Sequence, residues 1–183
     1  MYSNCADLVK AHEVFNQIGT PNLVSWNALI SAYAHVGQGY VALDMFREML
    51  AENIVPNLGT FTNVLTACSH DGLLKEGGKL FDVMCVVYGL FPMLDHYTCM
   101  INLFGRAGHF NQAIALLDKV PSSDHLSLLV AILGACQKWM NVKLGKWVFE
   151  QSLQLDVKCA SAYVFMGNIY AASSMQTEVT KLV

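Results

Sequence analysis

Apolar residues recur between residues 23 and 57 at the spacing of two amphipathic helices. The first set follows an i, i+3, i+4, i+7, i+8 pattern and the second repeats it: Trp26, Leu29, Ile30, Tyr33 and Ala34, then Ala42, Met45, Phe46, Met49 and Leu50. Gly37 lies between the two sets, where a helix can end in a left-handed turn. Pro56 follows the second set and prevents that helix from continuing. The pattern therefore predicts a helical hairpin.

The hairpin pattern recurs along the chain. The bulky residue at Trp26 has counterparts at steps of 35, 36, 32 and 34 residues: Phe61, Tyr97, Leu129 and Tyr163. A position in the second helix recurs with the same step lengths from Ala42 onward. It is occupied by Ala11, Ala42, Gly77, Ala113, Gly145 and Val179. The turn position holds glycine in three hairpins and another residue in the others: Gly37, Gly72 and Gly108, then Ala6, Met140 and Ser174. Because one hairpin cannot bury its own stripe, we predict an all-α fold, a right-handed α-solenoid of stacked helix-turn-helix repeats.

Composition and charge limit the partners of such a solenoid. Hydrophobic residues make up 54% of the sequence, charged residues make up 14%, and the net charge is -3. Nucleic-acid-binding domains usually have a basic surface, so the overall charge does not favour that class. The longest apolar run, residues 126–136, is shorter than the roughly 20 residues that span a bilayer. We therefore expect no membrane contact.

Six cysteines are spread along the chain without a pattern typical of metal binding: Cys5, Cys68, Cys85, Cys99, Cys136 and Cys159. There is no Cys-x-x-Cys pair, and no group of cysteines and histidines has zinc spacing. Cys68 and Cys136 occupy the same slot of the stripe in two hairpins, which indicates buried thiols and favours a reducing compartment. We expect no metal site and no cofactor.

Three stretches resemble a known family: MYSNCADLVKAHEVFNQI, LVSWNALISAYAHVGQGYVALDMFREMLAENIVPN and FTNVLTACSHDGLLKEGGKLF. They resemble the plant pentatricopeptide repeat proteins, specifically the subclass whose repeats alternate in length. The resemblance implies a partial short repeat, a standard repeat, a long repeat and a short repeat: residues 1–22, 23–57, 58–93 and 94–125. Residues 126–159 and 160–183 resemble the extension motifs of that subclass, the second of them truncated.

The resemblance implies binding of single-stranded RNA, with about one base read per repeat by side chains on the inner face. In the family, the residue after the aromatic and the last residue of the repeat select the base, and the second residue packs against it. In residues 23–57 these are Asn27, Asn57 and Val24, and an Asn pair implies C or U. The other units match in fewer positions: Asn22 in the first, Thr62 with Met93 in the long repeat, and Thr98 with His125 in the short repeat.

Other interpretations of these residues remain open. Asn27 also fits a solvated helix position, and Asn57 also fits an N-cap of the next helix. Trp26, Phe61 and Tyr97 lie on the apolar stripe, so we expect them in the core rather than stacked on bases. The main alternative function is a tetratricopeptide-like scaffold for protein interactions, since a peptide groove needs no basic surface.

Members of the resembled subclass act in organellar RNA editing, often with a deaminase domain that needs zinc, an HxE motif and a CxxC pair. Neither motif occurs in this sequence. The resemblance therefore implies a non-catalytic specificity and recruitment part of an RNA-processing or C-to-U editing factor in a mitochondrion or chloroplast. We expect no catalytic residue and no small-molecule substrate. Residues 126–183, which include Trp139 and Trp147, are the expected contact for editing-complex proteins.

Overall fold

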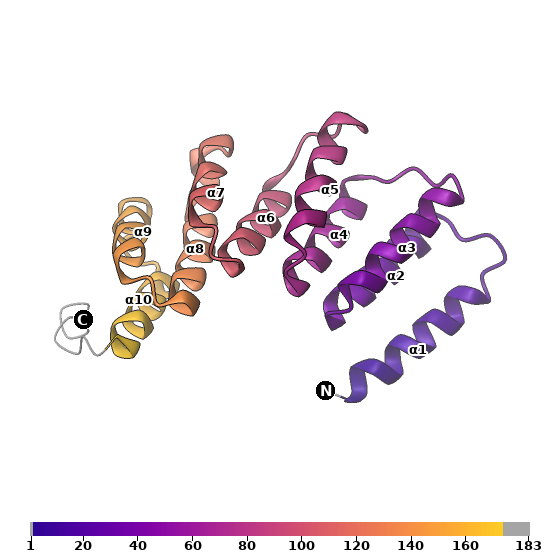
Figure 1. The fold of residues 1–183 in the computed structure, drawn as a ribbon, viewed down its shortest axis with the longest axis horizontal. Coiled ribbons are helices and arrows are strands. Elements are labelled where there is room, and N and C mark those ends of the chain that lie inside the picture. Colours follow the sequence, from indigo (N-terminus) through magenta and orange to yellow (C-terminus); the bar gives the residue numbers. More distant parts are fainter. Residues whose placement is uncertain (1, 174–183) are drawn as a thin grey trace. The chain divides into compact units, whose positions relative to one another are not determined.

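The computed structural model describes residues 2–173, with side chains for all of these except residues 2–7 and 122. Within this range the chain forms helices and no β-strand, which confirms the predicted all-α fold. Ten α-helices and two short 3₁₀ turns follow one another (Figure 1): α1 Tyr2–Asn16, α2 Leu23–Val36, α3 Gly39–Ala51, α4 Leu58–Asp71, α5 Leu74–Val86, α6 Leu94–Arg106, α7 Phe110–Ala115, η1 Leu117–Lys119, η2 Ser122–Asp124, α8 His125–Trp139, α9 Val142–Leu155 and α10 Ala160–Ala172.

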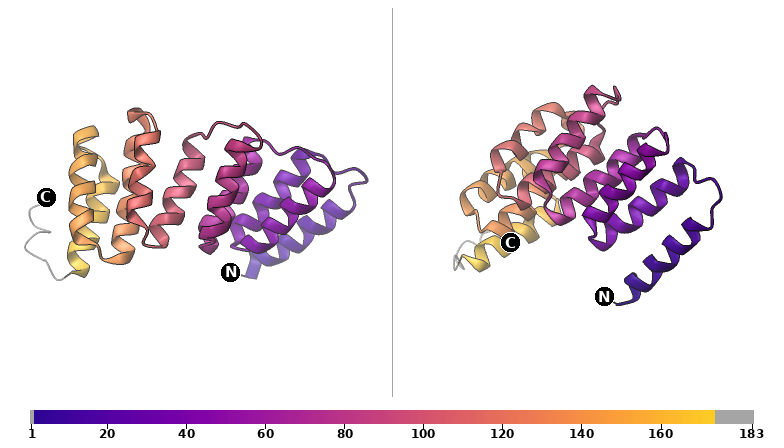
Figure 2. Two further views of the ribbon diagram at one scale, coloured as in Figure 1. Left: turned by 45° about the horizontal axis from the view of Figure 1, so that its top comes forward. Right: turned by 45° about the vertical axis from the view of Figure 1, so that its right-hand side comes forward.

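The helices divide between two compact units, residues 1–103 and residues 104–183, with the boundary inside α6. In the first unit, α2 packs against α1, α3 and α4, and α5 packs against α4. Both views of Figure 2 show α2 and α3 side by side in this unit. In the second unit, α8, α9 and α10 pack against one another, and α7 contacts α8. Consecutive helices thus pack as hairpins in α2 with α3, α4 with α5 and α8 with α9. First helices of neighbouring hairpins also pack directly together, α2 on α4 and α8 on α10.

Glycine ends the first helix of three hairpins, as the sequence predicts. Gly37, Gly72 and Gly108 have φ angles of 75°, 70° and 77°, in the left-handed region that glycine adopts without a steric penalty. Met140 takes the same position after α8 with a φ of 54°. Its side chain makes that conformation less favourable than it is for glycine. The positions at which these first helices end therefore follow from the backbone conformation of the residue after each helix.

Two helices differ from the predicted pattern. The turn predicted at Ala6 is wrong, because α1 runs through that residue without interruption. Alanine is the strongest helix former, and α1 contains neither glycine nor proline that would end it earlier. The second helix of residues 94–125 is short, since α7 ends at Ala115 and is followed by a 3₁₀ turn and Pro121. Ser174 and Val179 lie outside the described residues.

The apolar stripes form the core of each hairpin. Trp26 and Phe61 are buried, as predicted, and the Phe61 ring meets Phe46 edge to face with centroids 5.9 Å apart. Tyr97 is only half-buried, and its ring lies 5.8 Å from that of Phe81. No helix within residues 2–173 is both long and apolar enough to cross a membrane.

Cys68 and Cys136 are fully buried, as their slot in the stripe predicts. Burial raises the pKa of each thiol to about 12. Near Cys68 the carboxylates of Glu76 and Asp71 add to this effect, because a thiolate would be repelled by both. Both thiols are therefore neutral, packed groups at ordinary pH rather than nucleophiles or metal ligands.

Cys68 and Cys136 are expected to resist alkylation by iodoacetamide in the folded chain at neutral pH, and the half-buried Cys159 should react faster than either of them. Since the folded pKa of each buried thiol exceeds its ordinary value of 9.0, their contribution to stability is complete below pH 9.0. That contribution is lost as the pH rises toward about 12. Mass spectrometry of labelled peptides, with and without denaturant, gives the order of reaction. Equal labelling of Cys68 and Cys159 in the folded chain would contradict it.

Candidate nucleic-acid interface

The side chains of Asn27 and Asn57 meet within the first unit. Asn27 lies on α2, and Asn57 is the residue that begins α4. Asn27 Nδ2 donates a hydrogen bond to Asn57 Oδ1 over 3.3 Å. A second bond joins the same helices, because Asn63 Nδ2 donates to the backbone oxygen of Asn27 over 3.1 Å. The fold thus brings together two of the residues that the sequence assigns to one site.

Asn57 also caps α4. Its Oδ1 accepts the backbone N–H of Thr60 over 2.9 Å and the Thr60 hydroxyl over 3.0 Å. In return, the Asn57 N–H donates to Thr60 Oγ1 over 3.1 Å, which completes a capping box. The N-cap interpretation of Asn57 is therefore correct. It is compatible with a contact role as well, because Asn57 remains exposed.

Val24 lies beside this amide pair on the first turn of α2. It is 74% exposed, and it is three residues before Asn27, so the two side chains share one face of the helix. Asn22 begins the same helix, and its Oδ1 accepts the N–H groups of Val24 and Ser25 over 3.0 and 3.1 Å. An apolar side chain next to amides can pack against the face of a base while the amides contact its edge.

The Thr62 hydroxyl is already engaged by its neighbours. Thr62 Oγ1 donates to the Leu58 carbonyl over 3.1 Å and lies 3.2 Å from His96 Nε2. The other ring nitrogen, His96 Nδ1, accepts the backbone N–H of Met93 over 3.0 Å. Because a backbone N–H can only donate, His96 carries its proton on Nε2, and this proton points to the Leu58 carbonyl, 3.0 Å away. Thr62 is thus held in place by a histidine from α6.

Sequence reasoning missed His96, which is 1% exposed. It occupies the third position of its helix, where the equivalent residues Ser25 and Thr60 complete capping boxes with asparagine. Met93 has no side-chain oxygen to begin α6, and His96 supplies the remaining half of the box through Nδ1. The sequence does contain a signal for this role, because His96 stands at the helix position that holds serine or threonine in α2 and α4.

Thr98 and His125 belong to different units, and each makes a local bond. Thr98 Oγ1 donates to the Leu94 carbonyl over 2.9 Å. His125 Nε2 lies 2.8 Å from the Val120 carbonyl, to which it can only donate. Both side chains are half-buried at the first turns of their helices. Their joint action on one base stays a prediction.

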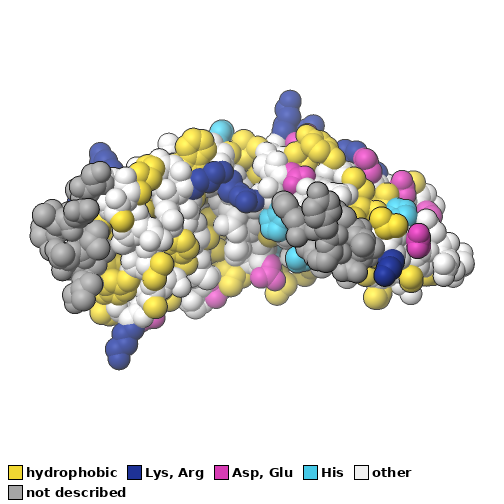
Figure 3. All heavy atoms as spheres, turned by 90° about the horizontal axis from the view of Figure 1, so that it is seen from below, with side chains coloured by type: hydrophobic (Ala, Val, Ile, Leu, Met, Phe, Trp, Pro, Cys, Tyr) yellow, Lys and Arg dark blue, Asp and Glu magenta, His cyan; other side chains and the backbone are white. Residues whose placement is uncertain are grey.

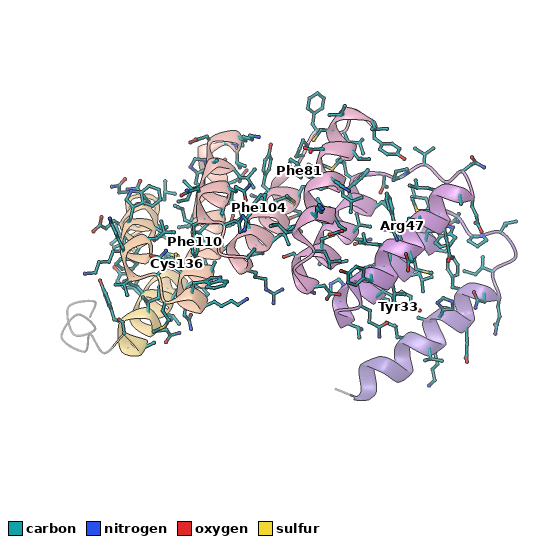
Figure 4. The ribbon with its side chains drawn as sticks, viewed as in Figure 1. Tyr33, Arg47, Phe81, Phe104, Phe110 and Cys136 are labelled. Carbon is teal, nitrogen blue, oxygen red and sulfur yellow. The ribbon has the colours of Figure 1, made fainter. Side chains whose placement is uncertain are left out.

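Cations are sparse on the surface. The chain has 11 Lys and Arg residues against 14 Asp and Glu residues. On the face drawn in Figure 3, the Lys and Arg side chains are scattered among hydrophobic and uncharged ones. Arg47, labelled in Figure 4, is further engaged by Asp44 on the same helix at 2.5 Å. A polyanion would therefore find few phosphate partners, and recognition would depend on contacts to its bases.

The second unit contains an open groove between α7 and α9. Its volume is about 860 Å³, and Phe110, Lys143 and Trp147 are among its lining residues. Trp147 is 42% exposed and Trp139 is 50% exposed, as expected for this region. Trp139 is also anchored, because its indole N–H donates to the Gly105 carbonyl over 2.9 Å. Among the described side chains of residues 8–121 and 123–173, no three His, Cys, Asp or Glu lie close enough to hold a metal ion.

Comparison with known families gives two kinds of repeat match. A model described as the PPR repeat family matches residues 21–70, and one described as the PPR repeat matches residues 59–86 and 95–125. Together these matches span more than half of the chain.

Curated relatives from Arabidopsis thaliana match nearly the whole chain. A mitochondrial pentatricopeptide repeat-containing protein is 38% identical over 96% of this chain, which corresponds to 31% of that protein. A chloroplastic one is 36% identical over 100% of this chain and 21% of its own length. The chain therefore spans less than a third of the length of these relatives.

Solved structures show the same fold. The crystal structure of the pentatricopeptide repeat protein PPR10 from maize matches with a TM-score of 0.72 and 24% identity, over 96% of this chain and 26% of that one. PPR10 in complex with an 18-nt psaJ RNA element matches with a TM-score of 0.82 and 19% identity over the same shares. This likeness confirms the predicted solenoid of stacked helical hairpins. With the repeat matches and the relatives, it establishes that the chain belongs to the pentatricopeptide repeat family.

Proposed function

We propose that this chain binds single-stranded RNA in a sequence-specific manner, through side chains on the first helices of its hairpins. The observation that carries the proposal is the contact between Asn27 and Asn57, with the exposed Val24 on the same face of α2. Amides can donate to and accept from the edge of a base, and valine offers an apolar surface for its face. Membership of a family with an RNA-bound relative supports this choice.

The role we propose for the whole protein is the specificity and recruitment part of an organellar RNA-processing or C-to-U editing factor, with no catalysis in this chain. A mitochondrial and a chloroplastic relative support an organellar location. The proposed units alternate in length over residues 23–57, 58–93 and 94–125, followed by extension motifs in residues 126–183. Contact with editing-complex proteins is proposed for the latter, where the groove beside Trp147 offers an aromatic surface.

RNA selection on the purified chain is expected to enrich a pyrimidine at one position. Asn27→Ala should abolish this enrichment and weaken binding to the selected RNA about fivefold to tenfold, because a base contact and the bond to Asn57 are both lost. Asn111→Ala is a matched control, since Asn111 is exposed and lines the groove of the second unit. It should leave the enrichment unchanged. No enrichment with the unmodified chain would contradict RNA reading and favour a protein-binding scaffold.

A further inference from the structure

The groove between α7 and α9 has an apolar floor to which both helices contribute. Phe110, labelled in Figure 4, and Ile114 lie four residues apart on α7. Leu144 and Trp147 lie three residues apart on α9. Because residues at these spacings share one face of a helix, each helix presents an apolar pair to the groove. The volume of about 860 Å³ falls within the roughly 300–1,000 Å³ of typical ligand pockets.

Trp147 is not part of the core of its hairpin. The buried face of α9 is formed by Gly145, Val148 and Phe149, and α9 packs against α8 and α10. Trp147 is instead 42% exposed, and within the described residues its indole N–H meets no acceptor. An exposed tryptophan with a free donor is the kind of side chain that anchors protein interfaces, since it combines a large apolar area with one polar group.

The rim of the groove is positively charged. Lys143 lines the groove four residues before Trp147, and none of the described lining residues is acidic. Among the described residues no carboxylate pairs with Lys143. The N-terminus of α9, which begins at Val142, adds partial positive charge from the N–H groups of its first turn. An apolar floor therefore lies beside a cation that has no partner within the described chain.

The charge of the chain is divided unevenly between the two units. Residues 104–183 contain seven Lys and Arg against five Asp and Glu, whereas residues 1–103 contain four against nine. An acidic partner is therefore favoured by the charge of the second unit and disfavoured by that of the first.

Resting on the protein-contact part of the proposed function, we infer that the groove between α7 and α9 binds an acidic protein segment that inserts an aromatic or large aliphatic side chain beside Trp147. The apolar floor takes the inserted side chain, and Lys143 attracts the carboxylates of the segment. RNA fits the groove less well, because one lysine neutralises few phosphates. The side chains proposed to contact bases also lie on first helices, whereas α7 and α9 are second helices.

Selection of phage-displayed random peptides on the purified chain is expected to enrich sequences in which Asp or Glu flanks an aromatic or large aliphatic residue. The affinity for a synthetic peptide of the enriched sequence should fall by about tenfold or more with Trp147→Ala and by about fivefold with Lys143→Glu. Selection on the Lys143→Glu chain should enrich Lys or Arg in place of Asp and Glu. Enrichment without acidic residues, or unchanged affinity in either variant, would overturn the inference.

Two control variants match these changes. Lys158→Glu makes the same charge reversal in the loop after α9, outside the groove. Phe91→Ala removes an aromatic side chain of the first unit that is 87% exposed. Both should leave the affinity for the peptide unchanged. Circular dichroism melting verifies the fold of Trp147→Ala, and the exposed Lys143 keeps the test decisive if that variant unfolds.

The outcomes separate this inference from the proposed function. If the selected peptides protect residues 126–183 from hydrogen exchange but do not depend on Trp147 or Lys143, the protein contact stands and the inference alone is wrong. If no peptide is enriched, the protein contact and the inference both fail, while RNA binding is tested separately through Asn27. If the selected RNA competes with the peptide and is weakened by Trp147→Ala, the groove is a nucleic-acid surface and the inference is overturned.

Discussion

Replacing His96 with alanine is expected to lower the unfolding free energy of the first unit by about 2–4 kcal/mol. His96 is 1% exposed, so its removal leaves a cavity between α4 and α6. It also leaves the Met93 N–H without its acceptor and removes the donor to the Leu58 carbonyl. Loss of packing and loss of buried hydrogen bonds thus act in the same direction.

Denaturant unfolding followed by circular dichroism gives the size of the His96→Ala effect, and hydrogen exchange of the first turn of α4 shows where it acts. His35→Ala is the control. His35 is exposed at the end of α2, and among the described residues its ring bonds only Ser31, one turn earlier in the same helix. Its replacement should change the unfolding free energy by no more than about 0.5 kcal/mol. Equal losses in the two variants would show that His96 does not tie the helices together.

Gly39→Ala is expected to destabilise the first unit by about 1–3 kcal/mol through overpacking. Gly39 begins α3, where its N–H donates to Asp71 Oδ2 over 2.6 Å. A Cβ at this residue would lie 2.7 Å from that oxygen and 2.9 Å from the backbone oxygen of Ala67. Since the backbone of α4 cannot move aside as a flexible side chain can, the two hairpins would have to separate.

Gly78→Ala makes the same chemical change in a different environment. Gly78 lies inside α5, and a Cβ there would meet no atom within 4 Å. Alanine favours helix over glycine by about 0.5–1 kcal/mol, so this variant should be more stable than the parent chain. Thermal melts of the two variants should therefore shift in opposite directions. A rise in melting temperature for Gly39→Ala would refute the close approach of α3 to α4.

The helices and their ends could be predicted because their causes are local. The apolar stripe around Trp26 specifies a buried face, and Gly37 specifies a left-handed turn, whatever the rest of the chain does. The turn at Ala6 was wrong for a related reason. The spacing of the repeats alone predicts a turn there, whereas α1 follows the local preference of alanine for helix.

The hydrogen bonds between hairpins could not be predicted from the apolar stripe of each helix. The Asp71 bond to Gly39 and the His96 bond to Leu58 join residues 32 and 38 positions apart. Their formation depends on how far one helix is shifted along the next, which apolar spacing does not define. The contact of Asn27 with Asn57 depends on the same shift between neighbouring helices. The family resemblance implies that both residues belong to one site, but the hydrogen bond between their side chains follows from the geometry alone.

The capping box at Asn57 also limits which mutations the site can tolerate. Only a short side chain with an acceptor oxygen can begin α4 without loss of stability, which leaves Asn, Asp, Ser and Thr as the main choices. Met93 shows the other route, in which a non-capping residue is compensated by His96 three positions later. Under the proposed function, a lineage that changed the base contact at Asn57 would therefore draw on a small set of residues or need a second mutation. The requirements of helix formation would thus restrict the RNA sequences that such a repeat could evolve to recognise.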